Sequence, residues 1–393
     1  MVEILELTAL PAMTPRQAPL PPETDNQIAL LVPDVPNADA LLPWLRKIDA
    51  SRHYTNFGPL EQELTARIRA LARAPHAVMT CNATAAITLW LWERVGAVGA
   101  RVAVPATTFV GTAQAVLASG NIPLILDIDP ETWQLSPQAV LEAARTQHIA
   151  AVLPVCAFGA VCKLPAWQTF AVETEIPVLI DAAAALGAQT CAPTIDVAYS
   201  LHTTKVLPAG EGGAIASYDA ALVERLHCRS NFGIGNNGES VLSGTNAKLS
   251  EYHAAIALAT LETWQSRQSR RHAVMRACLD ALHDKCGDAV LPAPHLSGSD
   301  FTGALPQLPV LLPAGVDLPR VIERMSAAKV QTRRWYYPPL HRHKVFARHP
   351  RAEELPIAEA LAARLLGLPF HPFLRPQDID RIAITLAAAL NQQ

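Results

Sequence analysis

From about residue 60 onward, segments whose hydrophobic residues have helical spacing alternate with short apolar runs. Apolar residues recur at helical spacing over 60–71, 84–92 and 108–119, and short uninterrupted apolar runs separate these segments. We expect those runs to be strands, at 76–80, 101–105, 123–127, 149–154 and 176–181. Uninterrupted apolar strands that alternate with helices are typical of a mostly parallel sheet covered by helices on both faces. The pattern therefore predicts an α/β fold.

The two ends of the chain depart from this alternation. Residues 1–36 are rich in proline and are expected to form an extended arm. After the large domain (37–265), the remainder (266–393) is expected to be a smaller α+β domain. Its predicted elements are the end of a long helix over about 250–282, a strand at 307–312, and helices at 318–328 and 356–366.

The composition is that of a well-buried globular enzyme. Of the 393 residues, 50% are hydrophobic and 17% are charged, which argues against disorder. The net charge of −3 gives no basis for binding nucleic acid or an anionic membrane. The seven cysteines include no CxxC pair, so neither a disulfide framework nor a metal site is expected. Because the sequence has no apolar run of about 18 residues and no secretory signal at residues 1–7, we expect a cytoplasmic protein.

The segment 200–213 reads SLHTTKVLPAGEGG, in which Lys205 lies between a Ser/Thr run and a glycine turn. A lysine amine forms a Schiff base with an aldehyde only when it is neutral, and desolvation lowers its pKa enough for that. Upstream, the apolar run 178–180 ends in Asp181, a carboxylate that suits the protonated ring nitrogen of pyridoxal phosphate (PLP). Either residue alone is more often structural. Together, in this order, they suggest a PLP lysine and its aspartate.

Two loops that follow predicted strands add further parts of a cofactor site. The segment 81–86 joins a strand to a helix, so the amides of Thr84 and Ala85 lie at a helix N-terminus, which favours a phosphate. An ordinary N-cap by Asn82 or Thr84 explains the same residues. Phe109 follows the next strand, where its ring either stacks on a planar cofactor or packs in the core. Since ligands gather at the carboxyl ends of parallel strands, we expect these loops to meet.

The chain resembles the DegT/DnrJ/EryC1/StrS family of sugar aminotransferases, which belongs to fold type I of the PLP enzymes, from about residue 56 to 381. The resemblance rests on motifs that follow the family's order: YTNFGPL (54–60), NATAA (82–86), PATTF (105–109), DID (127–129), PV with FG (154–155, 158–159), DAA (181–183), the segment 200–213, GTNAK (244–248) and LPFHP (368–372). It implies a mostly parallel seven-stranded sheet sandwiched by helices, with a smaller C-terminal α+β domain.

The resemblance also implies roles for matching residues. The implied cofactor-binding positions are Ala83, Thr84, Ala85, Phe109, Asp181, Ala184, Ser200, Lys205 and Asn246. Lys205 is implied to hold PLP as a Schiff base and to move the proton, and Asp181 to pair with the ring nitrogen, so these two are the catalytic residues. Asn246 is implied to reach the phosphate of the neighbouring subunit, which gives a homodimer with shared active sites. Tyr336 and His341 lie in a segment that lines the sugar side in relatives.

Three positions depart from the family's pattern. Ala83 stands where glycine is common, which adds a methyl group but leaves the amides available. Ala184 stands where relatives have Gln or His, and Lys248 replaces an arginine whose guanidinium suits a carboxylate or phosphate. These changes put the exact substrate in question more than the type of reaction.

The implied reaction moves an amino group from L-glutamate to a keto sugar nucleotide. The expected acceptor is a dTDP- or UDP-linked keto-deoxyhexose, aminated at C4 or C3, which would feed an O-antigen, another lipopolysaccharide or surface glycan, or an antibiotic sugar. A sugar 3-dehydratase of the same family would carry histidine in place of Lys205. Two alternatives stay open. One is another fold type I PLP enzyme, such as a lyase or a small-molecule aminotransferase; the other is a non-catalytic PLP-binding regulator, although no basic helix-turn-helix precedes the sheet.

Overall fold

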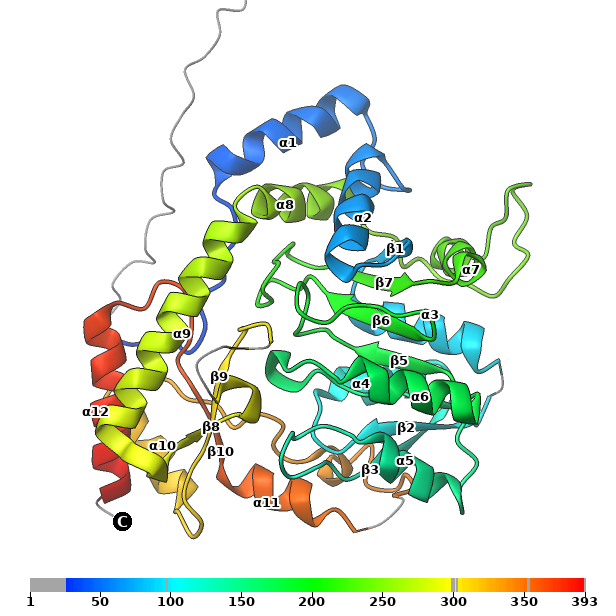
Figure 1. Ribbon diagram of the computed structural model, residues 1–393. Coiled ribbons are helices and arrows are strands. Elements are labelled where there is room, and N and C mark those ends of the chain that lie inside the picture. Colours follow the sequence, from blue (N-terminus) through cyan, green and yellow to red (C-terminus); the bar gives the residue numbers. More distant parts are fainter. Residues whose placement is uncertain (1–25, 97, 298–300, 302, 352–353, 392–393) are drawn as a thin grey trace, which may run out of the picture.

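The computed structural model describes residues 26–391 except for 97, 298–300, 302 and 352–353. A seven-stranded sheet forms its centre, in the order β1-β7-β6-β5-β4-β2-β3 (Figure 1). Its strands are β1 (His76–Thr80), β2 (Arg101–Pro105), β3 (Ile122–Leu126), β4 (Ala151–Val152), β5 (Val178–Asp181), β6 (Ile195–Ser200) and β7 (Gly213–Ser217). From β6 to β3 the strands run parallel, and β7 is antiparallel to both of its neighbours. The expected mostly parallel seven-stranded sheet is confirmed.

Both faces of this sheet are buried, because successive residues of a strand enter different hydrophobic clusters. In β2, Val102 and Val104 belong to one cluster and Ala103 to the other. The helices of this part are α1 (Ala38–Ser51), α2 (Pro59–Ala72), α3 (Ala83–Arg94), α4 (Val110–Ala118), α5 (Pro137–Ala144), α6 (Leu164–Thr174), α7 (Ala220–Ser230) and α8 (Glu251–Leu261). Helices α3, α4 and α7 contribute to the first cluster, and the other five to the second, so a layer of helices covers each face.

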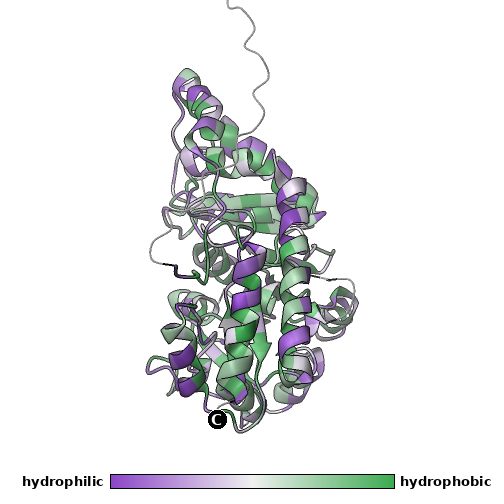
Figure 2. Ribbon diagram, turned by 90° about the vertical axis from the view of Figure 1, so that its left-hand side faces the viewer, coloured by the Kyte–Doolittle hydropathy of each residue, from purple (hydrophilic) through white to green (hydrophobic). Residues whose placement is uncertain are grey.

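A smaller α+β part follows the central sheet. Its three-stranded antiparallel sheet has the order β10-β9-β8. Its elements are α9 (Trp264–Cys286), β8 (Leu291–Pro292), β9 (Leu308–Leu311), α10 (Leu318–Ala327), α11 (Pro356–Arg364), β10 (Leu365–Leu368) and α12 (Pro376–Asn391). Helices α9 and α12 pack together along one side of the molecule, and the view of that side in Figure 2 shows hydrophilic and hydrophobic residues mixed along them. No helix in the described ranges is long and apolar enough to cross a membrane.

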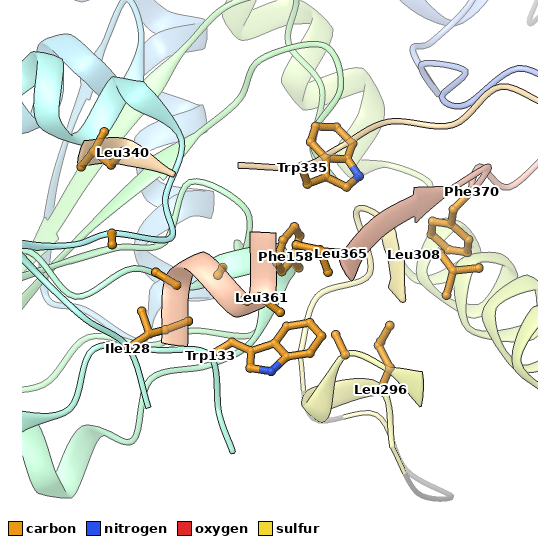
Figure 3. Packing of buried hydrophobic residues seen from close by; sticks show 14 of the residues in the cluster. Ile128, Trp133, Phe158, Leu296, Leu308, Trp335, Leu340, Leu361, Leu365 and Phe370 are labelled. Carbon is orange, nitrogen blue, oxygen red and sulfur yellow. The ribbon is translucent and has the colours of Figure 1, made fainter. Parts of the chain in front are cut away.

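One hydrophobic cluster joins the two sheets. Figure 3 shows Trp133 and Phe158, from loops beside the central sheet, gathered with Leu361 of α11 and Leu365 of β10. The backbone N–H of Leu340 also donates to the carbonyl of Ala106, at the end of β2, at 3.0 Å. The shared core therefore holds loops of the smaller part against the carboxyl ends of the central strands.

Three predicted elements differ from the structure. The helix expected over 250–282 is two helices, α8 and α9, which meet at an angle (Figure 1) because Thr263 between them leaves the helical region at φ −112°, ψ 19°. Helix α8 packs against α1 and α2, whereas α9 packs against α12. The direction of each helix is therefore set by different neighbours. The helix expected over 356–366 ends at Arg364, since the next residues pair with β9 as β10. The strand expected over 149–154 is reduced to the two paired residues of β4.

The predicted N-terminal arm is described only from residue 26 onward. Ile28 forms a parallel bridge with Val330, and its N–H donates to the carbonyl of Lys329 at 2.8 Å. The N–H of Phe370 donates to the carbonyl of Leu30 at 3.0 Å. This part of the arm is thus attached to the smaller α+β part. Residues 1–25 lie outside the described residues.

Candidate functional site

The loops that carry the predicted site residues meet at one edge of the central sheet. β5 ends at Asp181, and the neighbouring β6 ends at Ser200, whose partner across the sheet is Gly213. Gly213 also pairs with Thr80 at the end of β1, so the loops after β1 and β6 are neighbours. A Cβ on Gly213 would lie 2.3 Å from the carbonyl carbon of Asn82, so only glycine allows this close approach.

Asp181 is buried within electrostatic reach of Lys205. Its Oδ2 accepts the hydroxyl of Thr112 at 2.7 Å, and its Oδ1 accepts the N–H of Ala183 at 3.1 Å. Burial raises the pKa of Asp181, although these hydrogen bonds and the positive charge of Lys205 act to lower it. Desolvation lowers the pKa of Lys205, and the charge of Asp181 opposes that shift. Burial thus shifts Lys205 toward the neutral amine, the form that attacks an aldehyde.

Both interpretations of the segment 81–86, an ordinary N-cap and a phosphate site, apply to the N-terminus of α3. Asn82 caps the helix, since its Oδ1 accepts the N–H of Ala85 at 2.8 Å. The amides of Ala83 and Thr84 donate to no acceptor within the part of the chain that the structure describes, and Thr84 is exposed. An anion at this helix end can therefore take the amides of Ala83 and Thr84. The predicted contact of Ala85 with a phosphate would have to compete with the cap.

Phe109 is an exposed aromatic residue at the N-cap of α4. Its exposed fraction is 63%, which excludes the alternative that it packs in the core. A Cβ on Gly111 would lie 3.1 Å from Cδ1 of Phe109 and 3.3 Å from the hydroxyl oxygen of Thr84. The ring therefore lies close to the N-terminus of α3, where it is free to stack on a planar group.

The loop that carries Lys205 is held by short-range hydrogen bonds. The Oγ of the buried Ser200 accepts the N–H of His202 at 3.3 Å, and the carbonyl of His202 accepts the N–H of Lys205 at 2.8 Å. Nδ1 of His202 is 2.9 Å from the hydroxyl of Thr204. Ala184, half-buried after Asp181, adds only a methyl group to this side of the site.

Tyr336 and His341 have different surroundings. The ring of Tyr336 packs on Phe158 with 4.7 Å between centroids, and burial together with the charge of Asp181 raises the pKa of its hydroxyl. Tyr336 therefore lies on the same side of the sheet edge as Asp181. His341 is buried, and its Nε2 is 2.6 Å from Oε1 of Glu359 on α11. Its Nδ1 has no hydrogen-bond partner among the described residues.

Asn246 is exposed and lies in the irregular segment between α7 and α8. It forms a β-bridge with Asn231, and Nζ of Lys248 donates to the side-chain oxygens of both, at 2.8 Å and 2.9 Å. The carbonyl of Ala247 accepts the N–H of Cys81 at 2.7 Å, which anchors the segment beside the loop before α3. The side chain of Asn246 is thus exposed next to the loop after β1 of its own chain.

Thr112, which hydrogen-bonds Asp181, was not predicted from the sequence. It lies three residues after Phe109 in the first turn of α4, on the same helical face. A helical projection of the expected helix 108–119 could have drawn attention to it, but nothing in the sequence links that face to Asp181.

Comparisons with known proteins show the family of this chain. The model of the DegT/DnrJ/EryC1/StrS aminotransferase family matches residues 38–387. Protein Rv3402c of Mycobacterium tuberculosis is 31% identical over 93% of this chain and 91% of its own. The UDP-N-acetyl-3-dehydro-alpha-D-glucosamine 3-aminotransferase of Acidithiobacillus ferrooxidans is 31% identical over 91% of this chain and 95% of its own. DesI, solved in the presence of its TDP-sugar product, superposes with a TM-score of 0.83 at 31% identity, over 94% of both chains.

Proposed function

Because the chain belongs to the DegT/DnrJ/EryC1/StrS aminotransferase family, we propose that it transfers an amino group from L-glutamate to a keto sugar attached to a nucleotide. The observation that carries this proposal is the buried Asp181 within reach of the amine of Lys205, at the sheet edge where Phe109 is exposed. A UDP-sugar in the name of one relative and a TDP-sugar in the structure of DesI support the choice of acceptor. We propose a dTDP- or UDP-linked keto-deoxyhexose with its keto group at C4 or C3.

The residues at this edge fit pyridoxal phosphate. A positively charged ring nitrogen is a suitable partner for the buried carboxylate of Asp181. The amides of Ala83 and Thr84 lack acceptors among the described residues and lie at a helix N-terminus, where a phosphate binds favourably. The exposed ring of Phe109 offers a stacking face. We propose that the cofactor is held by these residues together with Ala85, Ala184, Ser200, Lys205 and Asn246.

The proposed roles follow from the surroundings of each side chain. Pyridoxal phosphate, when bound, supplies an aldehyde and an electron-withdrawing ring, the chemistry that carries an amino group between two carbonyl compounds. Nζ of Lys205 takes a proton from one substrate carbon and returns it to another position, so its pKa must lie within reach of neutrality. Desolvation lowers the pKa of Lys205, which shifts it toward that range. The hydrogen bonds from Thr112 and Ala183 favour the ionised form of Asp181 and hold its carboxylate in place.

We further propose a homodimer in which Asn246, whose side chain is exposed on the surface, completes the site of the neighbouring subunit. In this arrangement the large domain (37–265) binds the cofactor. The small domain (266–393) contributes Tyr336 and His341 to the sugar side. The orphan Nδ1 of the buried His341 supports a polar ligand there. The product would serve O-antigen or related glycan synthesis in the cytoplasm.

The test is mass spectrometry of the products formed from glutamate and a panel of dTDP- and UDP-linked 3-keto and 4-keto deoxyhexoses. We expect one acceptor to yield an amino sugar together with an equal amount of 2-oxoglutarate. Lys205→Ala is the matched inactive control. Borohydride reduction and peptide mapping should place the cofactor on Lys205, and its recovery on a different lysine would contradict the assignment. An eliminated product in place of an amine would favour the lyase alternative.

A further inference from the structure

A small, partly open cavity lies beside the loop that carries Lys205. Its polar walls are the side chains of Thr203 and Thr204, Arg271 of α9, and His371 after β10. Apolar residues of the segment 31–33, Pro306 and Phe370 complete the lining. Of these polar residues, only Thr203 and Thr204 belong to a loop of the site described above. Arg271 and His371 lie outside that site.

Arg271 is a buried cation without a carboxylate partner among the described residues. Its exposed fraction is 5%, and its Nη1 donates a hydrogen bond to the carbonyl of Leu305 at 3.2 Å. The nearby Asp34 pairs instead with Arg267, one turn earlier in α9, at 2.6 Å. Desolvation lowers the pKa of Arg271 to about 10, although the charge of Asp34 opposes the shift. A buried charge that is left unpaired is strongly unfavourable, so the cavity lacks one negative group.

The other polar groups of the cavity fit the same kind of ligand. His371 is 7% exposed, and its Nδ1 has no hydrogen-bond partner in the described ranges. Thr203 and Thr204 add hydroxyl groups. The planar guanidinium of arginine binds a carboxylate through two parallel hydrogen bonds. Lys248, the alternative cation, already donates to two asparagine side chains.

We propose that this cavity binds the side-chain carboxylate of a dicarboxylic amino donor, an inference that rests on the proposed aminotransferase function. Thr203 and Thr204 directly precede Lys205, so the cavity and the reactive amine share one loop. The charged group that acts on Lys205 is Asp181, whereas Asp34 and Arg267 act on Arg271. Arg271 lines the cavity, whereas Lys205 does not. An anion at Arg271 therefore stands away from the reacting amino group, as a side-chain carboxylate does and an α-carboxylate does not.

The test compares Arg271→Leu and Arg271→Lys with Arg270→Leu, a neighbour on α9 that does not line the cavity. We expect Arg271→Leu to raise the KM for glutamate about 10- to 100-fold and Arg271→Lys by a smaller factor, since lysine lacks the planar fork. The KM values for alanine as donor and for the keto sugar nucleotide should stay the same. Arg270→Leu should leave all three unchanged. If Arg271→Leu does not fold, Arg271→Lys carries the comparison.

A binding measurement on the holoenzyme separates this inference from the proposed function. Glutarate, a dicarboxylate that cannot react, should raise the thermal midpoint of the wild type and of Arg270→Leu but not that of the Arg271 variants. An unchanged KM for glutamate in the folded variants would overturn the inference. An equal rise in the KM for alanine would also overturn it, because the cavity would then bind the α-carboxylate. A rise confined to the KM for the sugar nucleotide would overturn it too, because the cavity would then bind a phosphate. If the wild type transaminates no acceptor but still binds glutarate through Arg271, the proposed function fails and the cavity assignment stands.

Discussion

Replacement of Glu61 should stabilise the protein at neutral and alkaline pH. Glu61 lies in the first turn of α2 and is 6% exposed, and its Oε1 accepts the hydroxyl of Thr65 at 3.1 Å. The carboxylate of Glu251 is close by, because its two oxygens accept the backbone N–H groups of Leu60 and Glu61 at 2.9 Å and 2.8 Å. Burial raises the pKa of Glu61 to about 7; the hydrogen bond from Thr65 opposes the shift and the charge of Glu251 adds to it.

The size and sign of the effect follow from this shift. An increase in the pKa of Glu61 from 4.5 to about 7 corresponds to about 3 kcal/mol. Between these two pH values the folded protein holds a proton that the unfolded chain has released. The free energy of unfolding therefore falls as the pH rises from 4.5 to about 7, and the loss is complete above that range. Glu61→Gln removes the titration, so the variant should exceed the wild type by about 2–3 kcal/mol at pH 8 and by little at pH 5.

Urea unfolding followed by circular dichroism at pH 5, 6, 7 and 8 measures this difference. Glu262→Gln, at the exposed end of α8, controls for the loss of one negative charge. A Glu61→Gln variant that is less stable than the wild type at pH 8 would refute the reasoning. A stability difference that does not change between pH 5 and pH 8 would refute it as well.

Three further predictions concern the scaffold and the site. Asp127→Ala should lower the free energy of unfolding by about 2–4 kcal/mol, because the carboxylate of Asp127 accepts the first two amides of α11 at 2.9 Å and 2.8 Å. Thermal unfolding measures this loss of stability, which should be smaller in Asp127→Asn. Asp181→Asn should lower the pKa of Lys205 further, since the charge of Asp181 raises it; mass spectrometry of Lys205 acetylation against pH in the apoprotein checks the direction, and a shift to higher pH would contradict it. Gly213→Ala should destabilise the protein and weaken PLP binding in an absorbance titration, because the new Cβ would collide with the backbone of Asn82; unchanged affinity would contradict the proposed position of the phosphate.

Five strands of the central sheet were predicted because of where they lie, whereas β6 and β7 were not predicted. Those of the central sheet are buried on both faces, as Val102 and Ala103 of β2 show by entering opposite clusters, and such strands appear in the sequence as uninterrupted apolar runs. Periodicity carries no information about partners in space. It therefore merged α8 and α9, which diverge at Thr263 to pack on different helices, and it extended α11 into residues that pair with β9.

The motifs that carried the resemblance divide into two groups that the sequence alone does not separate. Lys205, Asp181 and Phe109 meet at the sheet edge and form the candidate site. The motif 54–60 has a structural role, since a Cβ on Gly58 would lie 2.6 Å from the carboxyl carbon of Glu251, the residue that caps α2. The motif 127–129 likewise caps α11 through Asp127. Both groups keep the family's order, so only contacts tell a ligand site from a helix cap.

The charges of α9 show most clearly what a sequence cannot contain. Its first half reads WQSRQSRRHAVMR, a run of polar and basic residues that is typical of a solvated helix face. Arg267 and Arg271 nevertheless share the face that turns inward, one turn apart. Asp34, more than 200 residues earlier in the chain, pairs with Arg267 and leaves Arg271 in the cavity beside the Lys205 loop. One carboxylate, Asp34, lies near both the half-buried Arg267 and the buried Arg271, and the ligand proposed above would supply a second negative charge. This arrangement of charges exists only in the folded chain.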